Sequence, residues 1–138
     1  MIEPDLIKPL CLAFHHIGVA CQSIERELET FKTLGYAKEG DFFEDPEQGM
    51  RGLIISAKNQ PTLELVENLE GQETITTFLK RGVKFYHTCY TTPKIEKAKT
   101  AFINRGWMVL SPVKEGVLFR KICFIVNRQG FIVELGEV

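Results

Sequence analysis

The feature that most constrains the fold is a pair of residues, histidine and glutamate, that occurs twice at almost the same spacing. His16 precedes Glu64 by 48 residues. His87 precedes Glu134 by 47 residues, so the second pair is displaced by 71 residues at the histidine and 70 at the glutamate. Each of the four side chains lies in an apolar, strand-like run. Self-similarity at a fixed period indicates a repeated supersecondary unit, so we predict two copies of one unit.

The order of predicted elements is the same in both copies. In the first, Ser23 is a candidate N-cap and Gly35 a candidate helix end. In the second, Pro93 is at a good position for a helix start and Gly106 is a candidate helix end. Between the copies we expect a short helix at 74–80. The predicted strands are 14–20, one within 38–49, 50–57 and 62–68 in the first copy, and 85–91, 107–110, 118–127 and 131–138 in the second, with a loop at 111–116. We therefore expect an α+β fold: one domain, 1–138, built from two βαβββ modules at about 13–70 and 84–138.

Composition limits the classes of function. The chain has 138 residues, of which 44% are hydrophobic and 25% charged, and its formal net charge is −1. This is typical of a soluble globular domain, and it argues against nucleic-acid or membrane-surface binding. The four cysteines have no Cys-x-x-Cys spacing, which favours reduced thiols and a cytoplasmic location. We expect no signal peptide in the acidic segment that begins at Met1, and no membrane span.

The two glutamates interrupt strands that otherwise look buried. Because side chains alternate across a strand, Glu64 and Glu134 each face away from the apolar neighbours on either side. A buried carboxylate must be partnered, protonated or bound to a cation. Taken singly, each histidine or glutamate is as easily explained as a structural residue, and we interpret His15 in this way because it faces away from His16. We expect Glu67 to lie at the strand end in solvent. Two equivalent pairs in a repeat favour a metal site instead.

The predicted ligands are His16, Glu64, His87 and Glu134. Two imidazoles and two carboxylates suit one borderline divalent ion, namely Zn²⁺, Ni²⁺, Co²⁺, Mn²⁺ or Fe²⁺. Four protein ligands on an open sheet leave coordination positions for water or substrate, which is typical of a catalytic metal rather than a structural one.

Five runs of the chain resemble one family. The runs HIGVA at 16–20, LELVE at 63–67, FLKRGVKFYH at 78–87 and FIVEL at 131–135 are similar to motifs of methylmalonyl-CoA epimerases. The run PEQGMR at 46–51 resembles the segment that carries a catalytic glutamate in those enzymes. Epimerases of this type belong to the vicinal-oxygen-chelate superfamily, with glyoxalase I, extradiol dioxygenases and bleomycin-resistance proteins. The resemblance covers nearly all of residues 14–136.

The resemblance implies a fold and a reaction. It implies that the two modules form one cupped, glyoxalase-like mixed sheet that holds a single metal ion. It also implies proton transfer at the carbon next to a thioester carbonyl, with Glu47 and Glu134 as the catalytic acid/base residues. The substrate would be a small molecule, an acyl thioester such as an acyl-CoA, and the protein would form a homodimer.

Three alternatives remain open from the sequence. A glyoxalase I-like lyase would use the same ligands on a glutathione adduct. An extradiol dioxygenase is disfavoured, because Glu64 would occupy a position that dioxygen chemistry needs open. A non-catalytic, small-molecule-binding member of the superfamily is the alternative from another class of function, although such members often lose metal ligands that this chain retains.

Overall fold

The computed structural model describes residues 4–138. Met1 to Glu3, which begin the segment in which we expect no signal peptide, lie outside the described residues. The chain divides into two compact units. The N-terminal unit contains residues 16–86, and the C-terminal unit contains residues 87–138 together with 4–15. Among the described residues, no helix combines the length and the hydropathy needed to cross a bilayer.

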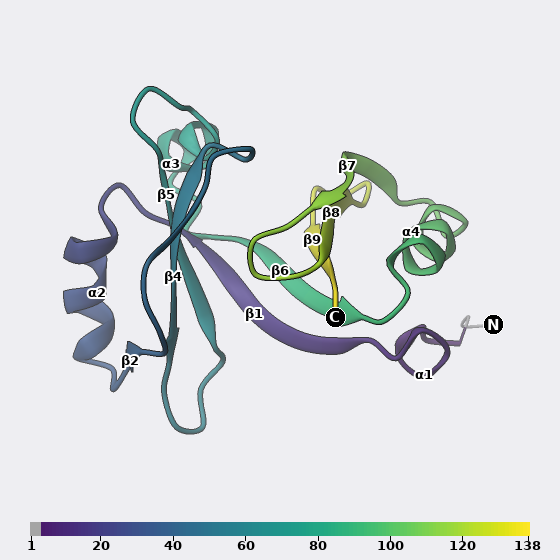
Figure 1. The fold of residues 1–138 in the computed structure, drawn as a ribbon, viewed down its shortest axis with the longest axis horizontal. Coiled ribbons are helices and arrows are strands. Elements are labelled where there is room, and N and C mark those ends of the chain that lie inside the picture. The colour runs from purple at the N-terminus through teal and green to yellow at the C-terminus, as the bar shows by residue number, and fades with distance from the viewer. Residues whose placement is uncertain (1–3) are drawn as a thin grey trace. The chain divides into compact units, whose positions relative to one another are not determined.

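The N-terminal unit is a small mixed sheet with a helix on one side (Figure 1). Within this unit the strand order is β2-β4-β5-β1, and β3 pairs with β4 further along. β1 runs parallel to β5, whereas β4 is antiparallel to β5, β2 and β3. The strand expected within 38–49 is β3, and β2 is a further short strand that ends at Lys38. The elements are β1 (Ala13–Ala20), α2 (Ile24–Lys32), β2 (Ala37–Lys38), β3 (Phe43–Asp45), β4 (Met50–Ser56), β5 (Leu63–Asn68) and α3 (Thr76–Arg81).

The C-terminal unit repeats this arrangement. Its strand order is β6-β9-β8-β7, and β6 runs parallel to β9 while the other neighbours are antiparallel. The predicted α+β class and the two βαβββ modules of a mixed sheet are thus confirmed, with one short helix, α1, that the sequence did not indicate. The elements are α1 (Ile7–Leu10), β6 (Phe85–Thr92), α4 (Ile95–Ile103), β7 (Met108–Glu115), β8 (Lys121–Val126) and β9 (Ile132–Glu137).

Two predicted boundaries in the C-terminal unit are wrong. The expected loop at 111–116 belongs to β7, which continues to Glu115 through two irregularities in its pairing with β8. Pro112 lies at one of these, where the register shifts between Ser111 and Lys114. An edge strand with a bulge tolerates a residue that has no N–H to donate, so the proline does not end the strand. The following strand begins at Lys121 rather than at 118.

Each unit fixes the start of its helix with a glutamate from its last long strand. Ser23 caps α2 as predicted, by accepting the Arg26 N–H at 3.3 Å. The Glu67 carboxylate accepts the Ile24 N–H at 3.0 Å. The expectation that Glu67 lies in solvent is therefore wrong. In the C-terminal unit the Glu137 carboxylate accepts the N–H of the first α4 residue at 3.1 Å, so the repeat extends to these contacts.

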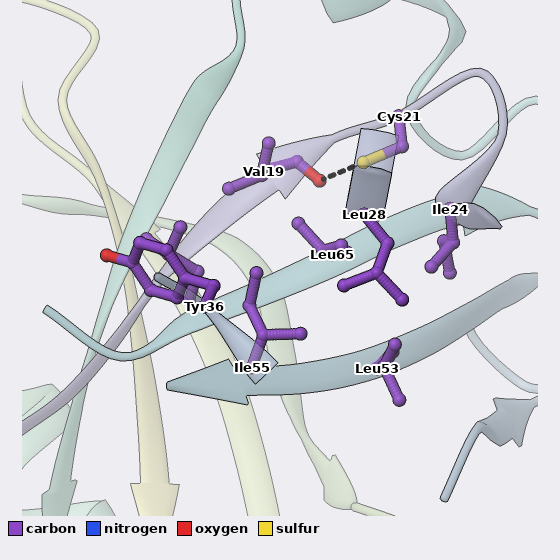
Figure 2. Close-up of a cluster of buried hydrophobic side chains, with 9 residues drawn as sticks. Val19, Cys21, Ile24, Leu28, Tyr36, Leu53, Ile55 and Leu65 are labelled. Atoms are coloured by element: carbon purple, nitrogen blue, oxygen red, sulfur yellow. Dashed lines mark hydrogen bonds between the residues drawn. The ribbon is translucent and has the colours of Figure 1, made fainter. Parts of the chain in front are cut away.

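The helix side of each sheet holds the apolar core. Figure 2 shows α2 packed on the sheet through Ile24 and Leu28, which meet Leu53, Ile55 and Leu65. In the C-terminal unit, α4 packs in the same way on β8 and β9. Burial of aliphatic side chains between a helix and one sheet face is the main favourable contribution to folding here. Because alternate strand residues face the other way, the remaining side of each sheet is available for other chemistry.

Candidate metal centre

In the N-terminal unit, the pairing of β1 with β5 brings His16 to Glu64. Gly18 lies directly opposite Glu64 in this parallel pair. His16 is two residues before Gly18 and therefore shares its face, on the side away from α2. The His16 Nε2 atom lies 3.2 Å from Glu64 Oε1. Both residues are buried, with exposed fractions of 0% and 5%.

The C-terminal unit has the same register. Cys89 lies directly opposite Glu134 in the parallel pair of β6 with β9, and His87 is two residues before Cys89. The His87 Nε2 atom lies 3.1 Å from Glu134 Oε1, and both residues are buried. The repeat seen in the sequence is therefore a repeat of strand register. His15, by contrast, is exposed, and its ring meets Phe119 edge-on at 4.9 Å between centroids.

Each pair offers two side chains of the kinds that ligate metal ions. All four side chains offer an imidazole nitrogen or a carboxylate oxygen that can ligate a metal ion. A carboxylate at this depth is costly to leave uncompensated, and a histidine nitrogen within hydrogen-bond distance offsets part of that cost. The same two atoms can instead direct lone pairs at a cation, provided that the imidazole is neutral and the carboxylate ionised. The donor set fits a borderline divalent metal.

A phenylalanine ring lies on a glycine beside each pair. Gly136 is two residues after Glu134 on the same face, and a Cβ there would lie 2.5 Å from the Phe119 ring. In the N-terminal unit, a Cβ at Gly52 would overlap the Phe43 ring. Gly52 is opposite Val66, which shares the face of Glu64. Each ring therefore lies on the same side of its sheet as the histidine–glutamate pair of that unit.

The helix side of β4 holds a charged network that is separate from the His16–Glu64 pair. Arg51, the last residue of the PEQGMR run, donates to Glu67 at 3.0 Å and to Glu25 at 2.9 Å. The guanidinium lowers the pKa of Glu25, mainly through this hydrogen bond. Since Arg51 is opposite Glu67 in the β4–β5 ladder, it faces α2 rather than Glu64. Its contacts explain it as a structural residue.

Glu47 lies in the turn at residues 46–49 that joins β3 to β4, and its side chain is exposed. Its catalytic role, like that of Glu134, stays a prediction. Sequence reasoning missed the residues that hold this turn. Asp45 is 4% exposed and accepts hydrogen bonds from the backbone and side chain of Gln48. An aspartate three residues before a bonded N–H is the local signal that could have identified it.

Comparison with known proteins identifies the family and the fold. A family model for the glyoxalase/bleomycin resistance protein/dioxygenase superfamily matches residues 15–124. A hypothetical protein from Bacillus halodurans C-125 has 20% identity and a TM-score of 0.79, covering 92% of this chain and 94% of that chain. Methylmalonyl-CoA epimerase from Mycobacterium tuberculosis has 18% identity and a TM-score of 0.77, covering 99% and 92%.

A third solved structure is similar and contains a ligand. A variant of Streptomyces coelicolor methylmalonyl-CoA epimerase in complex with 2-nitronate-propionyl-CoA has 20% identity and a TM-score of 0.69, covering 88% of this chain and 94% of that chain. At these identities the likeness shows the fold alone. Comparison with curated protein sequences gives no significant match. The superfamily predicted from the motifs is confirmed.

Proposed function

The chain belongs to the glyoxalase/bleomycin resistance protein/dioxygenase superfamily, and on this premise we propose that it is a metal-dependent epimerase or isomerase. The reaction is transfer of a proton at the carbon next to a thioester carbonyl. The observation that carries the proposal is the buried histidine–glutamate pair that occurs once in each unit with identical register. A structural pair needs no such duplication.

The proposed metal ligands are His16, Glu64, His87 and Glu134, which together hold one divalent ion. Support comes from the duplicated donor set and from the burial of all four residues. Two neutral imidazoles and two carboxylates balance the charge of a divalent cation, which offsets the cost of burying the carboxylates. The identity of the metal lies among Zn²⁺, Ni²⁺, Co²⁺, Mn²⁺ and Fe²⁺.

The proposed mechanism divides the work between the ion and two carboxylates. When bound, the ion stabilises the negative charge that develops on the thioester oxygen as the neighbouring C–H bond breaks. Glu47 takes or returns the proton from one side of the carbon, and Glu134 acts from the other. The exposure of Glu47 lets it exchange its proton with water between turnovers. General acid/base catalysis of this kind contributes about 10²–10⁴-fold in rate.

The substrate class in this proposal is an acyl thioester. Support comes from the structural neighbours, one of which is a methylmalonyl-CoA epimerase in complex with methylmalonyl-CoA. The homodimer and the cytoplasmic location remain predictions of the sequence.

Metal analysis followed by isotope exchange tests the proposal. We expect purified protein to hold one divalent ion per chain and to exchange the α-proton of methylmalonyl-CoA for deuterium in D₂O, followed by NMR. Glu47→Gln should abolish epimerisation and the exchange of the epimer whose proton Glu47 removes, and it should leave the metal content unchanged. Bound metal without exchange, together with turnover of methylglyoxal and glutathione, would replace the epimerase by the glyoxalase-like lyase. Ligand binding that survives His87→Ala without metal would favour the non-catalytic binding protein.

A further inference from the structure

The turn that carries Glu47 is held by more contacts than a four-residue turn requires. Its own closing bond is the Gly49 N–H to the Pro46 carbonyl at 3.1 Å. In addition, Asp45 accepts the Gln48 N–H at 3.1 Å and the Gln48 side-chain amide at 2.6 Å. The backbone on both sides of Glu47 is thus fixed, while the Glu47 side chain itself remains exposed.

The segment after β5 supplies the second half of this support. The Thr74 hydroxyl donates to the Gln48 carbonyl at 2.6 Å and lies 3.1 Å from the Gly49 carbonyl oxygen. The Leu69 N–H donates to the same Gly49 carbonyl at 3.0 Å. Gly49 has a φ of +71°, and a Cβ there would lie 2.8 Å from the Thr74 hydroxyl oxygen. Only glycine allows the hydroxyl to approach the turn this closely.

Asn68 connects this support to the strand that carries Glu64. Both residues are on β5, four apart and therefore on the same face. The Asn68 side-chain amide oxygen (Oδ1) accepts the Ile75 N–H at 2.8 Å, and the Asn68 side-chain NH₂ group donates to the Thr76 hydroxyl at 3.0 Å. These bonds fix the chain next to Thr74. The hydrogen bonds of Asn68 and of Thr74 thus connect the strand of one proposed metal ligand, through the backbone at residues 74–75, to the turn that carries Glu47.

We infer that Asp45 and Thr74 are positioning residues that hold Glu47 for proton transfer. This inference rests on the proposed function. A carboxylate that removes a proton from carbon must be placed within a few tenths of an ångström, and a displacement of about 1 Å can cost about 100-fold in rate. A purely structural turn needs its closing bond, but it does not need three further side chains from β3, β5 and the segment beyond it.

The test compares two threonines whose hydroxyl groups each donate a hydrogen bond to a backbone carbonyl. Thr74→Val removes the bond to the turn, and Thr74→Ser restores it. Thr33→Val is the matched control, because the Thr33 hydroxyl donates to the Thr30 carbonyl at the end of α2. We expect Thr74→Val to lower kcat for α-proton exchange by about 10- to 100-fold with KM and metal content unchanged. Thr74→Ser and Thr33→Val should keep kcat within about twofold of the wild type, a change too small for loss of positioning.

A second variant and a second readout keep the inference testable if Thr74→Val does not fold. Gln48→Met removes only the side-chain bond to Asp45, and we expect the same fall in kcat with unchanged KM. Amide hydrogen exchange at Gln48 and Gly49 should be faster in both variants, which reports the loosened turn without activity. A loosened turn with unchanged kcat would overturn the positioning role. Full activity in Glu47→Gln would instead overturn the proposed role of Glu47.

Discussion

Replacing one histidine of either pair should remove most of the stabilisation that a metal ion gives to this protein. At a free metal concentration 100 times Kd, binding stabilises the native state by about 2.7 kcal/mol. For 138 residues, the unfolding entropy is about 0.3 kcal/mol per kelvin, from about 2.1 cal/mol/K per residue. The wild-type melting temperature should therefore rise by about 9 °C on addition of metal.

His87→Ala removes one of four ligands. The affinity of the variant for the metal ion should therefore fall at least about 10- to 100-fold, which is the effect of losing a residue that only supports a metal ligand. At the same metal concentration a 100-fold weaker site leaves about 0.4 kcal/mol, or about 1.4 °C. His16→Ala should give the same result from the other unit. Thermal melts with metal and with EDTA, together with metal analysis, measure both. Glu29→Ala is the control and should keep the full shift, since Glu29 is exposed on α2, on the opposite side of the sheet from the His16–Glu64 pair.

If one ion is bound by both pairs, loss of either histidine removes nearly the whole shift. If His16→Ala and His87→Ala each retained about half of the shift, with the metal content of the wild type at two ions per chain, the pairs would be independent sites. No shift in the wild type with any of the five metals would reject the metal site altogether.

Three further predictions follow from the fold. Gly52→Ala should lower the free energy of unfolding by about 1–3 kcal/mol in urea titrations, because its Cβ would overlap the aromatic ring that covers it. A thiol reagent at pH 8 should modify Cys11 alone in the native protein and all four cysteines after unfolding; the others are buried, and burial raises the pKa of Cys21 to about 12. Because Arg51 lowers the pKa of Glu25, that carboxylate stabilises the fold above its unfolded pKa. The stability difference between wild type and Glu25→Gln should vanish as pH falls through the lowered pKa, as urea titrations at several pH values would show.

Much of the candidate site could be read from local pattern. Alternation along a strand is a property of adjacent residues, so the facing of Glu64 and the opposite orientation of His15 and His16 needed no tertiary information. The repeat then indicated that a second pair would have the same geometry. The helix start at Ser23 is likewise local, because an N-cap bonds an N–H three residues away.

The rest depended on which distant segments meet. Glu67 was expected in solvent, yet it accepts the N–H of Ile24, 43 residues away, because the parallel pairing of β1 with β5 brings the strand end to the helix start. Thr74 donates to the Gln48 carbonyl, 26 residues away, because β4 pairs with β5 and the segment after β5 returns to the start of β4. The Asn68 side chain holds this segment by accepting the Ile75 N–H. Sequence alone thus determined the repeat, the fold class and the side of the sheet that the ligands face. The helix-capping glutamates and the hydrogen bonds that hold the Glu47 turn were decided by strand register, because a hydrogen bond between distant segments forms only once pairing has brought them together.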